Sequence, residues 1–222
     1  MSPGLLVTLR ITHYNKNTGS LKDMSALDPT QTLVELTMAI CDIESVSSNE
    51  AKLADEIEQI LTTASHLSIT RDGNAIVART NLNRDTRVII AGHIDTVPVA
   101  ENLPTRLHHF EREQVIFGRG TVDMKGGIAV MLKLAVEIQQ PKFDVTWVFY
   151  DNEEVAADLN GLGRLARNHP EMLNGEFAVL CEPTSAMIEG GCNGTVRVEV
   201  RTVGIKAHSA RPWMGKNAIH EL

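Results

Sequence analysis

The sequence predicts an α/β fold in which a mainly parallel sheet is flanked by helices. Short, continuously apolar runs at 88–91, 145–150 and 177–180 are typical of strands that are buried on both faces. Segments with helical spacing of apolar residues lie between these runs, and this alternation favours strand–helix units with a parallel sheet. The 222-residue chain is 43% hydrophobic but only 4% aromatic, so its core should be mostly aliphatic.

The first part of the chain predicts two helices and a hairpin. Residues 30–43 have the apolar spacing of a helix, and Ser47–Glu50 resembles a cap for the next one. The turn sequence at 72–74 lies between two short runs at 67–71 and 75–79, which indicates a hairpin. We expect the two helices to bury the following residues: Leu33, Leu36, Thr37, Ile40, Leu53, Ile57, Ile60, Leu61 and Ala64.

The second part of the chain alternates strands with helices. The strand at 88–91 precedes a predicted helix at 126–138, and the strand at 145–150 precedes one at 159–168. Pro170 should end the latter helix, because the residue before a proline avoids helical geometry. The helix at 126–138 is expected to turn these residues inward: Ile128, Met131, Leu132, Ala135 and Ile138.

A glycine-rich joint at 190–194 marks a change of pattern. Residues 195–201 alternate apolar with polar or charged side chains, which predicts a half-exposed antiparallel strand. We therefore place a domain boundary at this joint. The residues after it are too few to bury a core of their own, so the sequence predicts a second domain that is cut short. Residues 1–24 lack such patterns and are expected to form a loose tail.

Charge and cysteine content limit the class of protein. The formal net charge is -7 and no basic stripe is present, which argues against nucleic acid as a partner. No apolar stretch reaches the roughly 20 residues of a membrane helix, and the apolar start at 5–11 lacks the features of a signal peptide. We therefore expect no membrane partner and a cytoplasmic location. The widely spaced Cys41, Cys181 and Cys192 favour reduced, packed thiols.

Candidate metal ligands lie next to the predicted strands. Ligands of an open α/β sheet bind beyond the carboxyl ends of its strands, so side chains that follow different strands can meet at one rim. One imidazole and several carboxylate oxygens suit a hydrolytic zinc-type centre. The residues of this set are His93, Asp123, Glu153, Glu154 and Glu182.

Each candidate also has a simpler interpretation when taken alone. His93 would be a hydrogen-bonded structural residue, but Asp95 can hold its second ring nitrogen, as the outer partners of metal ligands do. Asp123 fits a helix cap as well as a metal ligand, and the glycines around it favour close approach to an ion. Glu153 and Glu154 fit a solvated loop. Directly after a buried strand, however, they point in different directions, so one can bind metal while the other acts as general base.

The remaining histidines and motifs are less informative. Glu182 and His208, each taken alone, are typical of surface residues, and His108 and His109 have no partner acids and are expected at the surface. The chain has no His-Glu-x-x-His motif, which excludes the helix-type zinc proteases. It has no Gly-x-Ser-x-Gly elbow and no complete dinucleotide fingerprint, which argues against a serine hydrolase and a Rossmann enzyme.

Five motifs resemble, in order, those of the di-zinc amidohydrolase and metallopeptidase family of acetylornithine deacetylase and succinyl-diaminopimelate desuccinylase. They are Gly-His-Ile-Asp-Thr-Val-Pro, Gly-Arg-Gly-Thr-Val-Asp-Met-Lys-Gly-Gly, Glu-Glu, Glu-Pro-Thr and His-Ser-Ala-Arg-Pro-x-x-Gly-x-Asn-Ala-Ile. The resemblance covers about residues 25–222. It implies an incomplete zinc-exopeptidase-like catalytic domain over 25–192 and the beginning of a smaller α+β lid or dimerisation domain over 193–222.

The resemblance also implies a metal centre with two Zn²⁺ ions, or Co²⁺ in their place. Asp123 would bridge the ions, His93 and Glu182 would complete the first site, and Glu154 would belong to the second. The family's second site has a further histidine in a late segment, and this sequence stops at Leu222 before any such segment. We therefore expect the second ion to bind less well in this chain.

The resemblance implies roles in catalysis for three further residues. Glu153 would be the general base, and Asp95 would orient the imidazole of His93. His208, from the lid, would reach the scissile carbonyl in the active site of a partner subunit, which implies a homodimer when the protein is complete.

The connecting segments at 100–104 and 153–163 favour a bacterial desuccinylase within this family. The expected reaction converts N-succinyl-LL-2,6-diaminopimelate to succinate and LL-2,6-diaminopimelate, a step of lysine and diaminopimelate biosynthesis. The expected partner is therefore a small-molecule N-acyl amino acid substrate. An acetylornithine deacetylase and a carboxypeptidase are the alternatives within the same family. An inactive metal-binding or dimerising remnant is the alternative from another class.

Overall fold

The computed structural model describes residues 27–110, 113–191, 196 and 198–222. These residues form two compact units, one that extends to Ala186 and one that begins at Met187. Within the described ranges, no helix combines the length and the apolar character needed to cross a bilayer.

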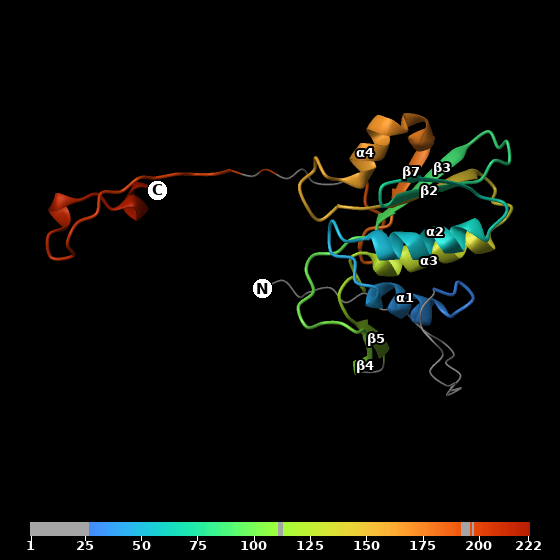
Figure 1. The fold of residues 1–222 in the computed structure, drawn as a ribbon, viewed down its shortest axis with the longest axis horizontal. Coiled ribbons are helices and arrows are strands. Elements are labelled where there is room, and N and C mark those ends of the chain that lie inside the picture. The colour runs from blue at the N-terminus through green and yellow to red at the C-terminus, as the bar shows by residue number, and fades with distance from the viewer. Residues whose placement is uncertain (1–26, 111–112, 192–195, 197) are drawn as a thin grey trace. The chain divides into compact units, whose positions relative to one another are not determined.

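The first unit is built on a mixed five-stranded sheet with the order β1-β2-β6-β3-β7 (Figure 1). The strands are β1 (Ser68–Asp72), β2 (Ala75–Arg79), β3 (Arg87–His93), β6 (Asp144–Tyr150) and β7 (Phe177–Leu180). β3 pairs in parallel with both β6 and β7, and the β1–β2 hairpin joins β6 in antiparallel fashion. The predicted hairpin is therefore present, and the predicted α/β fold is confirmed.

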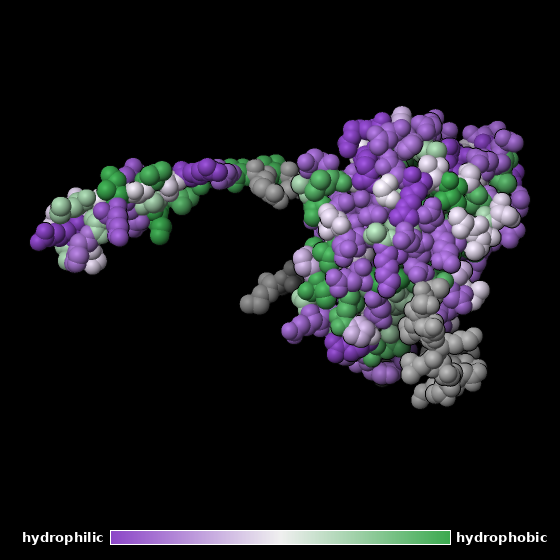
Figure 2. Space-filling model, viewed as in Figure 1, coloured by the Kyte–Doolittle hydropathy of each residue, from purple (hydrophilic) through white to green (hydrophobic). Residues whose placement is uncertain are grey.

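Helices cover both faces of this sheet. The helices are α1 (Leu33–Asp42), α2 (Ala51–Thr62), α3 (Lys125–Glu137) and α4 (Gly161–Asn168), followed by a 3₁₀ turn, η1 (Pro170–Leu173). Figure 1 shows α1, α2 and α3 on one face and α4 on the other. Alternate residues of a strand point to opposite faces, so Trp147 joins the larger core with α1–α3 and Val148 joins the smaller core with Leu165 of α4. Figure 2 shows hydrophilic residues over the outer side of α2.

The two predicted N-terminal helices begin in different ways. α1 starts with a capping box, in which the Thr32 hydroxyl accepts a hydrogen bond from Glu35 N and the Glu35 carboxylate accepts one from Thr32 N. The predicted cap from Ser47–Glu50 is wrong, because Glu50 makes no side-chain cap hydrogen bond to α2. Its carboxylate instead accepts a hydrogen bond from Ser48 N at 2.7 Å.

A small hairpin stands apart from the main sheet. It consists of β4 (Arg106–Phe110) and β5 (Glu113–Phe117), which pair with each other in a two-stranded sheet. The strand that precedes Asp123, β5, therefore does not belong to the main sheet. Asp123 lies in the loop between β5 and α3 rather than at the end of a main-sheet strand. His108 and His109 are exposed on β4, as predicted.

Two predictions of burial are wrong. All of β7 is exposed: it lies at one edge of the described sheet, next to β3, and none of its residues belongs to either of the two described cores. Ile138 is 41% exposed, because it caps the C-terminus of α3 instead of lying within its buried face.

The second unit contains two 3₁₀ turns, η2 (Pro212–Met214) and η3 (Ala218–Glu221), and an isolated bridge between Ile205 and Lys216. The strand predicted at 195–201 is not formed by residues 196 and 198–201, and the other residues of that range lie outside the described part. The predicted tail at 1–24 and the boundary between 192 and 193 also fall outside it and stay predictions.

Candidate metal centre

His93 is the last residue of β3, and its side chain is almost completely buried. Its Nδ1 lies 3.0 Å from the backbone carbonyl oxygen of Asp95 and 3.4 Å from Oδ1 of the same residue. An Nδ1–H that is donated to Asp95 leaves Nε2 available as a ligand atom. Asp95 thus has the geometry for the predicted orienting role, with its carbonyl oxygen as the closer partner.

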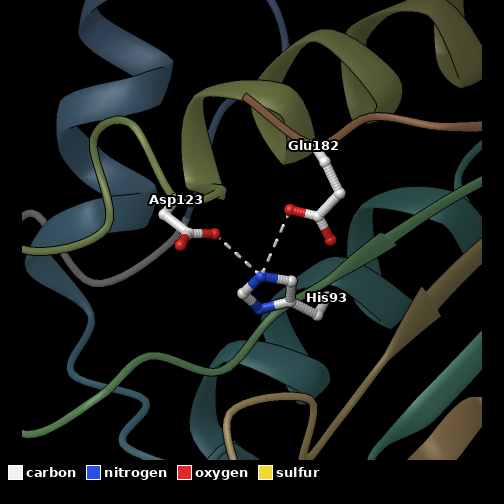
Figure 3. A group of neighbouring side chains, drawn as sticks. All are labelled: His93, Asp123 and Glu182. Atoms are coloured by element: carbon white, nitrogen blue, oxygen red, sulfur yellow. Dashed lines mark hydrogen bonds and ion pairs between the residues drawn. The ribbon is translucent and has the colours of Figure 1, made fainter. Parts of the chain in front are cut away.

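Asp123 and Glu182 both approach Nε2 of His93 (Figure 3). Oδ1 of Asp123 is 3.1 Å from this nitrogen, and Oε2 of Glu182 is 3.8 Å from it. Figure 3 shows the three side chains converging from the end of β3, the loop before α3 and the segment after β7. Two donors that are each about 2.1 Å from one tetrahedral ion lie roughly 3.4 Å apart, so the observed spacings fit ligands that share an ion.

Asp123 is not a helix cap in this structure. The N-cap of α3 is Met124, which makes no side-chain cap hydrogen bond, and the Asp123 side chain is 54% exposed at its outer side. The sulfur of Met124 accepts a hydrogen bond from His93 N at 3.2 Å. The residue after Asp123 therefore supports the backbone of the histidine, and the alternative that Asp123 caps the helix is not supported.

Glu153 and Glu154 form a second potential metal-binding group with His93, in the loop after β6. Glu153 N donates to Oδ1 of Asp95 at 2.9 Å, and Glu154 N donates to Oδ2 at 3.1 Å. Asp95 is completely buried. It therefore contacts the imidazole on one side and the backbone of the paired acids on the other.

Carboxylates outnumber cationic groups in this cluster, and the pKa values show the consequence. Burial and the charge of Asp123 raise the pKa of Glu154. Burial raises the pKa of Glu182, and Asp123 raises it further. Burial alone would lower the pKa of His93, but its hydrogen bonds to Asp123 and Asp95 raise that pKa to about 10. Excess negative charge around a single imidazole fits a divalent cation of the zinc type.

Two cavities border the cluster in the first unit. A cavity of about 170 Å³ is lined by Thr96, Val97, the 118–123 loop and Glu154. A second cavity, of about 340 Å³, lies next to Glu182 and is bounded by α1, β5 and α3. Space for a small organic group is therefore present beside the candidate ligands.

His208 belongs to the second unit, where it is exposed and its Nδ1 accepts a hydrogen bond from Ala210 N at 3.1 Å. Its predicted role at the substrate carbonyl stays a prediction.

Sequence reasoning missed the polar residues that surround the predicted ligands. Ser47 donates a hydrogen bond to Asp95, and Ser48 donates one to Asn152, beside the paired acids. The dipeptide looked like a helix cap, and its real partners are 48 and 104 residues away along the chain. Lys125 is also buried, and its Nζ donates to the carbonyl oxygen of Ile43 at 2.7 Å.

Comparison with known proteins identifies relatives of this chain. Residues 89–218 match the model of Peptidase family M20/M25/M40. A Mycobacterium tuberculosis protein that carries the provisional name succinyl-diaminopimelate desuccinylase DapE is 52% identical over 190 residues, covering 85% of this chain and 52% of that protein. The succinyl-diaminopimelate desuccinylase of Corynebacterium glutamicum is 44% identical over 194 residues, with the same coverage. The chain spans about half the length of these relatives.

Solved structures show the same fold at low sequence identity. A tripeptidase from Staphylococcus aureus aligns with a TM-score of 0.62 at 18% identity, covering 87% of this chain and 54% of that one. The aminopeptidase PepT of Bacillus cereus aligns with a TM-score of 0.56 at 15% identity, covering 89% of this chain and 55% of that one. The family match covers more than half of the chain and includes the candidate ligands, and the chain therefore belongs to peptidase family M20/M25/M40.

Proposed function

We propose that this chain is the metal-binding part of an amidohydrolase that cleaves N-succinyl-LL-2,6-diaminopimelate into succinate and LL-2,6-diaminopimelate. The observation that supports the chemistry is the convergence of one buried imidazole with carboxylates from three separate segments. The relatives named as desuccinylases, at 44% and 52% identity, support the choice of substrate. The activity belongs to the lysine and diaminopimelate pathway in the cytoplasm.

The proposed metal ligands divide between two ions. His93 and Glu182 would hold the first ion, Glu154 would belong to the second, and Asp123 would be shared by both. Zinc is the proposed metal, with cobalt as a substitute, since three oxygen ligands and an imidazole suit both. When bound, the ions polarise the amide carbonyl and lower the pKa of water so that it attacks near neutral pH.

Glu153 is the proposed general base. Its carboxylate takes the proton of the attacking water and passes it to the amine nitrogen as the amide C–N bond breaks. Asp95 holds the backbone amide of Glu153, so the base starts from a fixed position. His208 would donate a hydrogen bond to the developing oxyanion, a contribution of about 10²–10³ in rate, in a homodimer whose lid supplies it.

A carboxypeptidase is the second candidate. An Aspergillus clavatus protein that carries the provisional name carboxypeptidase is 30% identical over 218 residues, which covers 92% of this chain and 51% of that protein. A panel of N-succinyl, N-acetyl and peptide substrates separates the two candidates. Preference for the N-succinyl compound supports the desuccinylase, and preference for a peptide with a free carboxylate overturns it.

Metal counting and turnover together test the proposal. Zinc is counted by native mass spectrometry, and hydrolysis is measured with the same preparation. In Glu153→Gln we expect zinc to remain bound while turnover falls by at least ~10². Glu137→Gln is the matched control, because Glu137 pairs with Lys133 on the surface of α3. Full turnover by Glu153→Gln would remove Glu153 as the base, and one zinc or none without hydrolysis in the wild type would favour the inactive remnant.

A further inference from the structure

The segment between α1 and α2 reaches the candidate site through Ser47. The Ser47 hydroxyl donates to Oδ2 of Asp95 at 2.7 Å, and Ser47 N donates to the carbonyl oxygen of Thr96 at 3.1 Å. Oδ2 is the same oxygen that accepts the amide hydrogen of Glu154. The serine thus helps fix a carboxylate whose other partners are the backbone amides of the paired acids.

Ser48 makes a second connection to the same acids. Its hydroxyl donates to Oδ1 of Asn152 at 2.9 Å, and Asn152 immediately precedes Glu153. Ser48 has φ 71° and Asn152 has φ 57°, so both residues at this contact occupy the left-handed region. Residues other than glycine stay in that region only where surrounding interactions hold them there, and such positions gather at functional sites.

The serine segment is itself anchored from the far side. Glu50 is completely buried, and its carboxylate accepts hydrogen bonds from Ser48 N at 2.7 Å and from Nδ2 of Asn74 at 3.1 Å. Asn74 lies in the turn between β1 and β2. Because both oxygens of this buried carboxylate have partners, the segment is tied to the sheet and has little freedom to move away from Asp95.

The turn that carries the acids is also held on its other side. The guanidinium of Arg164 makes two hydrogen bonds to the carboxylate of Asp151, at 2.7 and 3.2 Å, and donates to Oδ1 of Asp72 at 3.0 Å. Asn152 follows Asp151 in the chain, and its side chain accepts the hydrogen bond from Ser48. The backbone ahead of Glu153 is therefore fixed from α4 and from the serine segment together.

We propose that Ser47 and Ser48 are positioning residues that hold the turn of Glu153 and Glu154 in place for the metal centre. Ser47 acts through Asp95, and Ser48 acts through Asn152. The catalytic meaning of this inference rests on the proposed function, but the structural link exists without a metal. Its first test therefore needs neither metal nor substrate.

The first test is amide hydrogen exchange, measured by NMR on the metal-free chain. In Ser47→Ala, the amides of Glu153 and Glu154 should exchange roughly tenfold faster or more, because Asp95 loses one of the hydrogen bonds that fix it. Ser47→Thr keeps the hydroxyl and should restore slow exchange. Equal exchange in Ser47→Ala and wild type would overturn the role of Ser47.

Ser45→Ala is the matched control. Ser45 lies in the same segment and is completely buried, but its hydroxyl donates to the carbonyl oxygen of Ile94 and not to the side chain of Asp95 or Asn152. The exchange of the Glu153 and Glu154 amides should stay within about twofold of wild type once any global loss of stability is subtracted. The same acceleration in Ser45→Ala as in Ser47→Ala would show a general loosening and would overturn the inference.

Ser48→Gly tests the second connection without a folding problem. Glycine accepts the left-handed backbone at this position, so the change removes the hydroxyl while it relieves the backbone cost. We expect faster exchange at Glu153 with an unchanged melting temperature. Unchanged exchange would overturn the role of Ser48, whatever the result for Ser47.

A cobalt titration then connects the positioning to the metal centre. Loss of a direct outer partner of a metal ligand typically weakens metal binding 10–100-fold. Ser47 acts one step further out, through Asp95, so Ser47→Ala should bind Co²⁺ about tenfold more weakly, at the low end of this range, and alter its visible absorption spectrum. Ser45→Ala and Ser47→Thr should match wild type. A wild type that binds no Co²⁺ would refute the proposed metal centre and leave the exchange result to decide the positioning. Wild-type cobalt binding with an unchanged spectrum in Ser47→Ala would overturn the link between the serine and the centre.

Discussion

Strands β6 and β7 both precede acids of the candidate site, but they differ in burial and in the number of strands that they pair with. Every residue of β6 is buried, and this strand pairs with β2 on one side and β3 on the other. Every residue of β7 is exposed, and among the strands that the structure describes it pairs only with β3. Both strands are predominantly apolar in sequence, so the difference in burial arises from their neighbours. Glu153 and Glu154 consequently follow a strand that is fixed on all sides, whereas Glu182 follows an edge.

The largest expected effect comes from the core of β6. Phe149 is completely buried and packs in the cluster with α1–α3. Phe149→Ala should lower the free energy of unfolding by about 3–5 kcal/mol, because a large buried side chain is lost and a cavity remains. Urea unfolding followed by circular dichroism measures this loss. A loss below ~1 kcal/mol would mean that the core residues of β6 do not stabilise the fold as strongly as the comparison with β7 requires.

The start of β6 gives an intermediate, pH-dependent effect. Burial would raise the pKa of Asp144, but hydrogen bonds from Leu82 N, the Thr80 hydroxyl and Arg84 N, with the nearby Arg87 charge, lower it below its usual value. The stability that this carboxylate contributes is therefore present at neutral pH and is lost as the pH falls below ~4. Asp144→Asn should cost about 1–3 kcal/mol at pH 7, and much less in acid.

Urea unfolding at pH 7 and at low pH checks the prediction for Asp144. Glu176, just before β7, is the matched control, because its carboxylate accepts a hydrogen bond from Arg87 N but is exposed to solvent. Glu176→Gln should have the smaller effect. A cost of Asp144→Asn that stays constant with pH would contradict the assigned cause.

The smallest effect is expected in β7. Leu180 is 52% exposed, so Leu180→Ala should change the free energy of unfolding by less than ~0.5 kcal/mol. The same urea measurement serves for this variant. A loss comparable with that of Phe149→Ala would show that the two strands contribute equally to the free energy of unfolding, and the contrast between them would be wrong.

Local patterns were sufficient to predict most of the elements of this fold. The apolar spacing of α1–α4 and the turn at 72–74 depend on nearby residues, and the structure has the corresponding helices and hairpin. The side chains of His93, Asp123 and Glu182 do come together, because parallel strands end at a common edge and the 118–124 loop reaches the same point. Their roles as metal ligands remain a proposal.

The failures share a physical cause, which is that burial and partners depend on distant parts of the chain. An apolar run such as Phe177–Leu180 indicates a strand, but only its neighbours decide whether it is covered. The residues Ser47–Glu50 have cap-forming chemistry, yet Asp95 and Asn152 offer their polar groups better partners. Neither outcome is visible in a local window of sequence.

Gly161 limits which residues this chain can accept at the first position of α4. Its amide donates to the carbonyl oxygen of Asp151 at 2.8 Å, and a side chain built at this position would collide with the backbone and the carboxylate of Asp151. Any larger residue would have to displace either α4 or the turn that bears Glu153. A library of substitutions at position 161, screened for variants that fold as stably as the wild type, should therefore return glycine almost alone, although the residue itself carries no chemistry.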